Sequence, residues 1–155
     1  MRITDLLSKD GIELNVNAKD KNDIINKMTK LMLKTGRITD LNAYTELVLK
    51  REEEGSTGVG EGIAIPHGKG DCVTEPGLVA MVVPNGVEYD ALDGKPVNLL
   101  FMIAAPNTSD NVHLDVLSRL STMLMDTEFK NKLISAKSKE EFLNIINETE
   151  NEKFK

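Results

Sequence analysis

The sequence has 155 residues, and 40% of them are hydrophobic, which is enough for a single domain with one continuous core. A net charge of −6 and an isoelectric point near 5.0 argue against nucleic-acid binding, because this surface would repel the phosphates. The apolar stretches fall far short of the roughly 20 residues that a membrane helix needs, and no secretory signal is expected. We therefore expect a cytoplasmic protein, in agreement with the single cysteine, Cys72.

Two amphipathic helices are predicted in the first third of the chain. The first begins after Asp20, a suitable N-cap residue, and continues with apolar residues at helical spacing until Gly36. The second begins near Asp40 and places Arg51 near its C-terminal end. The acidic run 52–54 that follows is expected to be a solvated helix end.

Residues 55–70 contain six glycines. The run lacks the Gly-Lys-Ser or Gly-Lys-Thr ending of a P-loop, and no strand is predicted before it, so a nucleotide site is not expected. We expect instead a loop whose backbone N–H groups approach a phosphoryl group, with the Thr57 hydroxyl as a further donor. The short apolar run 63–65, stopped by Pro66, predicts a brief strand entering a turn that presents His67.

The second half of the chain contains two apolar segments, 78–83 and 97–103, that are too short for typical helices and are predicted to be buried central strands. A third helix is expected after segment 107–110, which offers several N-cap candidates. Its apolar residues are Leu114, Leu117, Leu120 and Leu124.

Two shorter helices are expected at the C-terminal end, one at 128–134 and one after a capping box that begins at Ser138. The polar residues from Glu148 onward are expected to fray. Helices that alternate with short buried strands indicate an α/β fold, with a mixed sheet flanked by helices on both faces. We expect one such domain over residues 1–148, followed by a polar tail at 149–155.

The chain has two histidines, and each allows two interpretations. His67 follows a strand and a proline and precedes Gly68, so it is either an exposed nucleophile or an ordinary turn histidine. His113 lies in the first turn of the third helix on the side of Leu117, so it is either a core histidine or a residue that helps the helix N-terminus hold a phosphate.

A metal site is a further alternative. It would combine the two histidines with Asp71, Cys72 or Asp115, but these residues show no recognised ligand spacing. The sequence therefore predicts no metal site and no cofactor.

Three segments together resemble a known protein family. The sequence GSTGVGEGIAIPHGK at 55–69, preceded by Lys50-Arg51-Glu52, resembles the active-site segment of the fructose/mannitol-type (type 2) IIA domains of the bacterial phosphotransferase system. The segments DGKPVNLLFMIAAP at 93–106 and HLDVLSRLSTML at 113–124 follow in the expected order. The nitrogen-type regulatory IIA proteins share the Pro-His segment, but the later two segments are more similar to the fructose type.

The resemblance implies a phosphocarrier. His67 would accept a phosphoryl group from the phosphocarrier HPr and donate it to a IIB domain or subunit during sugar uptake. His113 would hydrogen-bond the phosphoryl group, while Arg51 and Thr57 would neutralise or orient it. The alternative is a nitrogen-type regulatory protein that controls partners through its phosphorylation state. The sugar is not readable from the chain, because a IIA domain handles only the phosphoryl group.

Overall fold

The computed structural model describes residues 2–108 and 111–154. The helices are α1 (Ile3–Leu6), the 3-10 turn η1 (Lys9–Gly11), α2 (Lys21–Lys34), α3 (Leu41–Glu53), α4 (Val112–Leu124), α5 (Thr127–Ile134) and α6 (Lys139–Lys153). The strands are β1 (Ile12–Glu13), β2 (Gly58–Gly60), β3 (Ile63–Ala64), β4 (His67–Gly70), β5 (Gly77–Val87) and β6 (Val97–Pro106).

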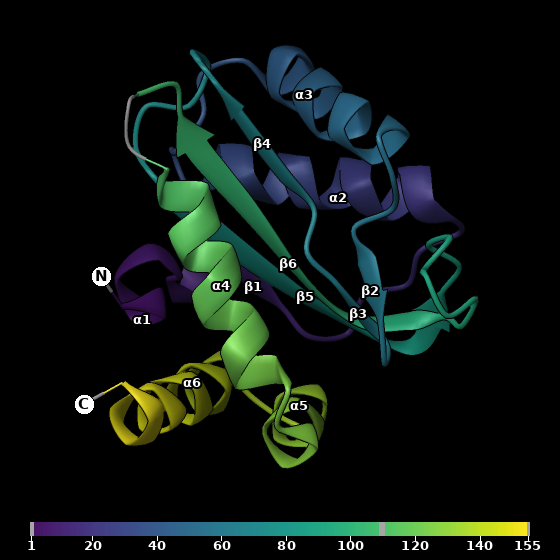
Figure 1. The fold of residues 1–155 in the computed structure, drawn as a ribbon, viewed down its shortest axis with the longest axis vertical. Helices are drawn as coiled ribbons and strands as arrows, with labels where there is room; N and C mark the ends of the chain where they lie inside the picture. The colour runs from purple at the N-terminus through teal and green to yellow at the C-terminus, as the bar shows by residue number, and fades with distance from the viewer. Residues whose placement is uncertain (1, 109–110, 155) are drawn as a thin grey trace.

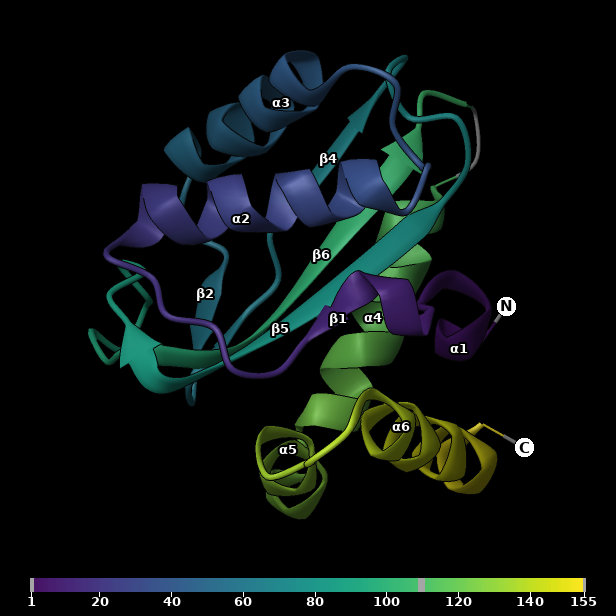
Figure 2. The same cartoon turned by 180° about the vertical axis from the view of Figure 1, so that it is seen from behind.

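Within these residues the strands form one six-stranded mixed sheet in the order β1-β5-β6-β3-β2, with β4 also paired to β6. The central strands β5 and β6 are antiparallel, whereas β3 and β4 run parallel to β6. Helices α2 and α3 cover one face of the sheet, and α1, α4, α5 and α6 cover the other (Figures 1 and 2). The prediction of a single α/β domain is confirmed.

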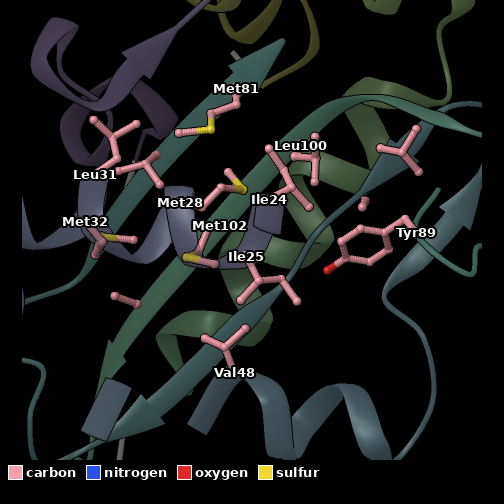
Figure 3. Packing of buried hydrophobic residues seen from close by; sticks show 14 of the residues in the cluster. Ile24, Ile25, Met28, Leu31, Met32, Val48, Met81, Tyr89, Leu100 and Met102 are labelled. Atoms are coloured by element: carbon pink, nitrogen blue, oxygen red, sulfur yellow. The ribbon is translucent and has the colours of Figure 1, made fainter. Parts of the chain in front are cut away.

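The two central strands are apolar along their length because helices cover both of their faces. Successive side chains of a strand point to opposite faces, so every position of β6 between Leu99 and Ala105 is buried. On the α2 and α3 side, Leu100 and Met102 pack against Met28 and its neighbours (Figure 3). On the other side, Phe101 packs against α4 and α6. The two strand predictions are confirmed, and both strands extend beyond the predicted segments.

The helices α2 and α3 begin where their N-cap residues predict. The carboxylate of Asp20 accepts a hydrogen bond from Asp23 N at 2.9 Å, and the carboxylate of Asp40 accepts one from Ala43 N at 3.0 Å. Each bond satisfies a backbone N–H that has no partner inside its own helix. The short elements α1, η1 and β1 were not predicted.

The glycine-rich segment is not a continuous loop. Its central residues form β2, which pairs antiparallel with β3, and the carbonyl of Gly58 accepts a hydrogen bond from Leu92 N. A Cβ atom on Gly58 would lie 2.9 Å from the backbone of Ala91. Glycine is therefore needed there because another segment of backbone approaches closely.

His67 does not lie in a turn, as the sequence suggested, but is the first residue of β4. Pro66 interrupts the path from β3 to β4 because it has no N–H group to donate. Its carbonyl nevertheless accepts a hydrogen bond from Ile103 N at 3.0 Å. The chain therefore continues alongside β6, and His67 pairs with Ile103.

The third predicted helix is confirmed as α4, with two differences. Its N-cap residue is Asn111, which makes no side-chain cap; neither Asn107 nor Thr108 caps it, and the candidates Ser109 and Asp110 lie outside the described residues. The side chain of Leu114 is 50% exposed instead of anchoring the helix. The buried residues of α4 are Val116, Leu120, Met123 and Leu124.

Both C-terminal helices are confirmed, but the expected fraying from Glu148 is wrong. Helix α6 continues to Lys153, and Glu150 within it is fully buried. Its carboxylate accepts hydrogen bonds from Ile3 N at 2.7 Å and from Arg119 Nε at 2.9 Å. The last turns of α6 are thus fixed to the N-terminus and to α4. No helix within residues 2–108 and 111–154 combines the length and apolar character that a membrane crossing requires.

Candidate functional site

The half-buried ring of His67 is held by a backbone carbonyl two residues earlier in the chain. Its Nδ1 atom lies 3.1 Å from the carbonyl oxygen of Ile65. A carbonyl can only accept a hydrogen bond, so in the neutral ring Nδ1 carries the hydrogen and Nε2 keeps its lone pair. The geometry presents Nε2 as the nucleophilic atom of this side chain.

His113 from α4 lies beside His67. The two ring centroids are 6.1 Å apart, with an angle of 30° between the ring planes. Burial, followed by the nearby His67 and Lys69, lowers the pKa of His113 below its ordinary value of 6.5, although Asp115 acts in the opposite direction. A neutral His113 at pH 7 can still donate one hydrogen bond to an anion.

Arg51 comes to the same place from α3. This helix packs closely on β4, since a Cβ atom on Gly68 would lie 3.1 Å from the ring of Tyr44 and 3.2 Å from Val48. The guanidinium of Arg51 donates from Nη1 to the carbonyl of Gly55 at 2.9 Å. Arg51 therefore reaches the site from a helix whose distance to the strand is set by the glycine that follows His67.

The three residues line one open pocket with a volume of about 460 Å³. Lys50 and Lys69 also line it, so the lining contains three cationic side chains and one carboxylate, that of Glu54. In a protein with a net charge of −6, this is a local concentration of positive charge. Such a site attracts an anion and stabilises its charge.

The sequence-based reasoning overlooked Lys69, because it placed His67 in a turn and not at the start of a strand. Residues two apart on a strand share a face, so Lys69 in β4 lies on the same side as His67.

Thr57 is not among the residues that line this pocket. It is 4% exposed, and its hydroxyl donates to the carboxylate of Glu52 and lies 3.1 Å from the hydroxyl of Tyr89. The structure thus brings His67, His113 and Arg51 together but places the Thr57 hydroxyl in a separate buried cluster.

The expectation that the acidic run 52–54 is solvated is wrong for Glu52. This residue is 9% exposed and forms an ion pair with Lys21 Nζ at 2.9 Å. The sequence held a signal for this, because Tyr44, Val48 and Glu52 recur every four residues and form one buried stripe on α3.

For the metal alternative, no three His, Cys, Asp or Glu side chains of residues 2–108 and 111–154 gather as ligands. Asp71 instead accepts a hydrogen bond from Asn107 Nδ2 at 3.1 Å. Burial raises the pKa of the Cys72 thiol, which disfavours the thiolate that a metal would need.

Comparison with known proteins identifies the family. Residues 5–149 match the family model described as "Phosphoenolpyruvate-dependent sugar phosphotransferase system, EIIA 2". The fructose-specific EIIABC component of Bacillus subtilis (strain 168) is 45% identical over 148 residues, which are 96% of this chain and 23% of that relative. The chain therefore spans less than a quarter of that relative's length.

Two solved structures share the fold over nearly their whole length. The nitrogen regulatory protein IIA-Ntr from Neisseria meningitidis matches with a TM-score of 0.87 and 30% identity, covering 93% of this chain and 98% of that one. In the complex of enzyme IIAMTL and phosphorylated enzyme IIBMTL from Escherichia coli, the matching chain has a TM-score of 0.81 and 28% identity, with 92% and 99% covered. The family resemblance seen in the sequence is confirmed: the chain belongs to the EIIA 2 family of phosphocarriers and is a phosphotransferase component of the phosphoenolpyruvate-dependent sugar phosphotransferase system.

Proposed function

We propose that the protein accepts one phosphoryl group from HPr on Nε2 of His67 and donates it to a IIB domain or subunit of a sugar permease. The observation that carries this proposal is the hydrogen bond from His67 Nδ1 to the carbonyl of Ile65, which leaves the Nε2 lone pair free beside a cationic pocket. In the transfer, a bond forms between Nε2 and phosphorus while the bond from phosphorus to the donor breaks. The electron pair of that bond stays on the donor.

The residues around His67 stabilise the transferred group. Phosphoryl transfer needs mainly alignment and charge stabilisation from a protein. The Arg51 guanidinium stays charged at all relevant pH values and offers several donors to the phosphoryl oxygens. His113 donates one further hydrogen bond, and Lys69 adds positive charge. This carrier role belongs to the cytoplasm, where we place the protein.

Fructose is the proposed sugar of the cognate permease. Support comes from the 45% identity to a fructose-specific EIIABC component, together with the fructose-type character of segments 93–106 and 113–124. The IIB partner is supported by the likeness to the IIAMTL chain in the complex with phosphorylated IIBMTL.

A regulatory role is the second candidate. The observation in its favour is the TM-score of 0.87 to IIA-Ntr, although the identity to that protein is only 30%. In this case the phosphorylation state of His67 would control binding to another protein, and the phosphoryl group would not be passed to a permease.

Phosphorylation with purified components tests the proposal. Incubation with phosphoenolpyruvate, enzyme I and HPr should add one phosphoryl group that is labile in acid and stable in base, and His67→Ala should abolish the labelling. His113→Ala serves as the matched variant: it should still be labelled but should donate more slowly. Labelling of His67→Ala, or a phosphoserine, would overturn His67 as the acceptor.

Onward transfer separates the two candidate roles. The isolated phosphoprotein should lose its phosphoryl group when a fructose-type IIB domain is added. A phosphoprotein that keeps its group in the presence of that domain, yet binds a partner only in one phosphorylation state, would favour regulation.

A further inference from the structure

Glu52 is a buried carboxylate in the last turn of α3, next to Arg51 in the sequence. Its Oε1 atom pairs with Lys21 Nζ at 2.9 Å, and the same ammonium lies 4.8 Å from the centre of the Tyr89 ring. Lys21 is the first residue of α2, where the helix dipole disfavours a cation. The Glu52 carboxylate offsets that cost, so the pair holds the end of α3 against the start of α2.

Thr57 is attached to this carboxylate by two groups. Its backbone N–H donates to Oε1 at 3.1 Å, and its hydroxyl donates to Oε2. The hydroxyl hydrogen is thereby used, so the Tyr89 hydroxyl, 3.1 Å away, must donate to the Thr57 oxygen. Burial, with the Glu52 charge second, raises the pKa of Tyr89 well above its ordinary value, which keeps that donor protonated. The ring of Tyr89 is buried and belongs to the apolar cluster shown in Figure 3.

The backbone of Thr57 leads from this cluster to the phosphoryl acceptor. The Thr57 carbonyl accepts a hydrogen bond from Ile65 N at 3.0 Å. The carbonyl of Ile65 in turn lies 3.1 Å from His67 Nδ1, the contact that selects the ring tautomer. Three consecutive hydrogen-bonded links therefore join the carboxylate of Glu52 to the ring of His67.

The turn that ends α3 holds Arg51 independently of the Glu52 carboxylate. Gly55 N donates to the main-chain carbonyl of Glu52 at 3.1 Å, and the carbonyl of Gly55 accepts from Arg51 Nη1 at 2.9 Å. Because neither bond involves the Glu52 side chain, replacing that side chain is expected to act on His67 and to leave these contacts of Arg51 in place.

We propose that Glu52 is a positioning residue for phosphoryl transfer, whose carboxylate holds the His67 ring in place through Thr57 and Ile65. The proposal rests on the proposed function of His67 as acceptor. It assigns the Thr57 hydroxyl to this buried cluster and not to the phosphoryl group. A buried charge with several fixed partners suits such a role, because removing any partner leaves the others unsatisfied.

The first experiment compares Glu52→Gln with Glu53→Gln, which changes the same charge at an exposed neighbour. For transfer from phospho-HPr, Glu52→Gln should lower kcat by about a hundredfold, the usual consequence of a misplaced reacting group. KM should stay unchanged, because the residues that line the open pocket are kept. Glu53→Gln should match the wild type in both constants.

The ¹⁵N chemical shifts of His67 report its ring tautomer, which should not change in Glu52→Gln if Glu52 only stabilises the fold. In the wild type the neutral ring should be mostly the Nδ1–H tautomer, and Glu52→Gln should shift the population toward Nε2–H. A residue that only stabilised the fold would lower the melting temperature but leave the tautomer and the kcat of folded molecules as they are.

A second pair of variants decides the same question if Glu52→Gln does not fold. Thr57→Ser keeps the hydroxyl and should transfer at close to the wild-type rate, whereas Thr57→Val should lower kcat by about a hundredfold. A Thr57→Val protein that folds and transfers at the wild-type rate would overturn the proposal. Where Glu52→Gln does fold, the double variant Glu52→Gln/Thr57→Val should be no slower than either single variant, because both act through one cluster. If Thr57 touched the phosphoryl group directly, the two losses would multiply.

The inference is overturned if Glu52→Gln folds and transfers at the wild-type rate, or if the losses of the two variants multiply. These results are distinguishable from failure of the proposed function, in which His67→Ala itself would still be labelled.

Discussion

Among residues 2–108 and 111–154, two carboxylates near helix ends are buried, Glu52 in α3 and Glu150 in α6, and their surroundings are similar. Each pairs with a cation at 2.9 Å, Lys21 in the first case and Arg119 in the second, and Glu150 has a further ion pair with Arg2 Nη2 at 3.9 Å. Each also accepts a hydrogen bond from a backbone N–H outside its own helix. For Glu52 the donor is Thr57 N, just beyond the end of α3, and for Glu150 it is Ile3 N, at the other end of the chain. Both sites therefore share a buried carboxylate with a close cation and a backbone donor.

What distinguishes them is the element that each carboxylate fixes. Glu52 holds Thr57, whose carbonyl accepts a hydrogen bond from the backbone N–H of Ile65, two residues before His67. Glu150 holds the start of α1 against α4 and α6. Helix α4 also lines the His67 pocket through His113, Leu114 and Leu117, but the hydrogen bonds of the Glu150 carboxylate go to Ile3, Thr4 and Arg119 and to none of these three residues. The same kind of interaction is thus expected to control reactivity in one place and only stability in the other.

The largest effect that tests this difference is expected for Glu150→Ala. Removal of the carboxylate leaves Arg119 and two backbone N–H groups without their acceptor, which should lower the free energy of unfolding by about 3 kcal/mol. The lower end of the usual range applies because the Arg119 side chain is 20% exposed and retains some water. Urea unfolding measures this loss, with the exposed Glu148→Ala as control. If folded Glu150→Ala transferred phosphoryl more slowly than the wild type, the contrast with Glu52 would be lost.

A smaller effect is expected for Tyr89→Phe, at the edge of the Glu52 cluster. The hydroxyl of Thr57 loses one donor but keeps its bond to Glu52, so the free energy of unfolding should fall by about 1 kcal/mol. Because the path from Glu52 to His67 stays intact, kcat should fall far less than in Glu52→Gln. Stopped-flow transfer kinetics would measure it, and a loss as large as that of Glu52→Gln would place Tyr89 on the path to His67.

Both carboxylates were misjudged from the sequence for the same physical reason. A glutamate at a helix end is usually solvated, and its burial depends on partners distant in the chain, such as Lys21 for Glu52 and Ile3 for Glu150. The α/β class, the main helices and the strands β5 and β6 followed from local periodicity and capping, which a sequence displays directly.

The pocket could be anticipated only in part. The Pro66-His67-Gly68 sequence indicated His67, and the family resemblance implied His113 and Arg51. No sequence spacing, however, predicts that α3 and α4 come together at β4. The surroundings of Thr57 could not be read either, because its hydroxyl partner Tyr89 is 32 residues away. The role of each site residue in transfer remains a prediction.

The smallest expected effect concerns His113, which extends the comparison to an ionisable group whose nearby negative charge, Asp115, does not offset its burial. Burial, then His67 and Lys69, lower its pKa below 6.5, so the unfolded chain binds a proton more strongly than the folded one. The stability that depends on neutral His113 is therefore complete above pH 6.5 and is lost as the pH falls from there through the lower pKa of the folded state. NMR titration should show His113 titrating below 6.5, and Lys69→Met should move its pKa upward by removing one positive charge. Phosphorylation of His67 should move it in the same direction and further, because a phosphoryl group carries up to about two negative charges. A pKa of His113 that did not respond to phosphorylation would mean that His113 does not face the transferred group.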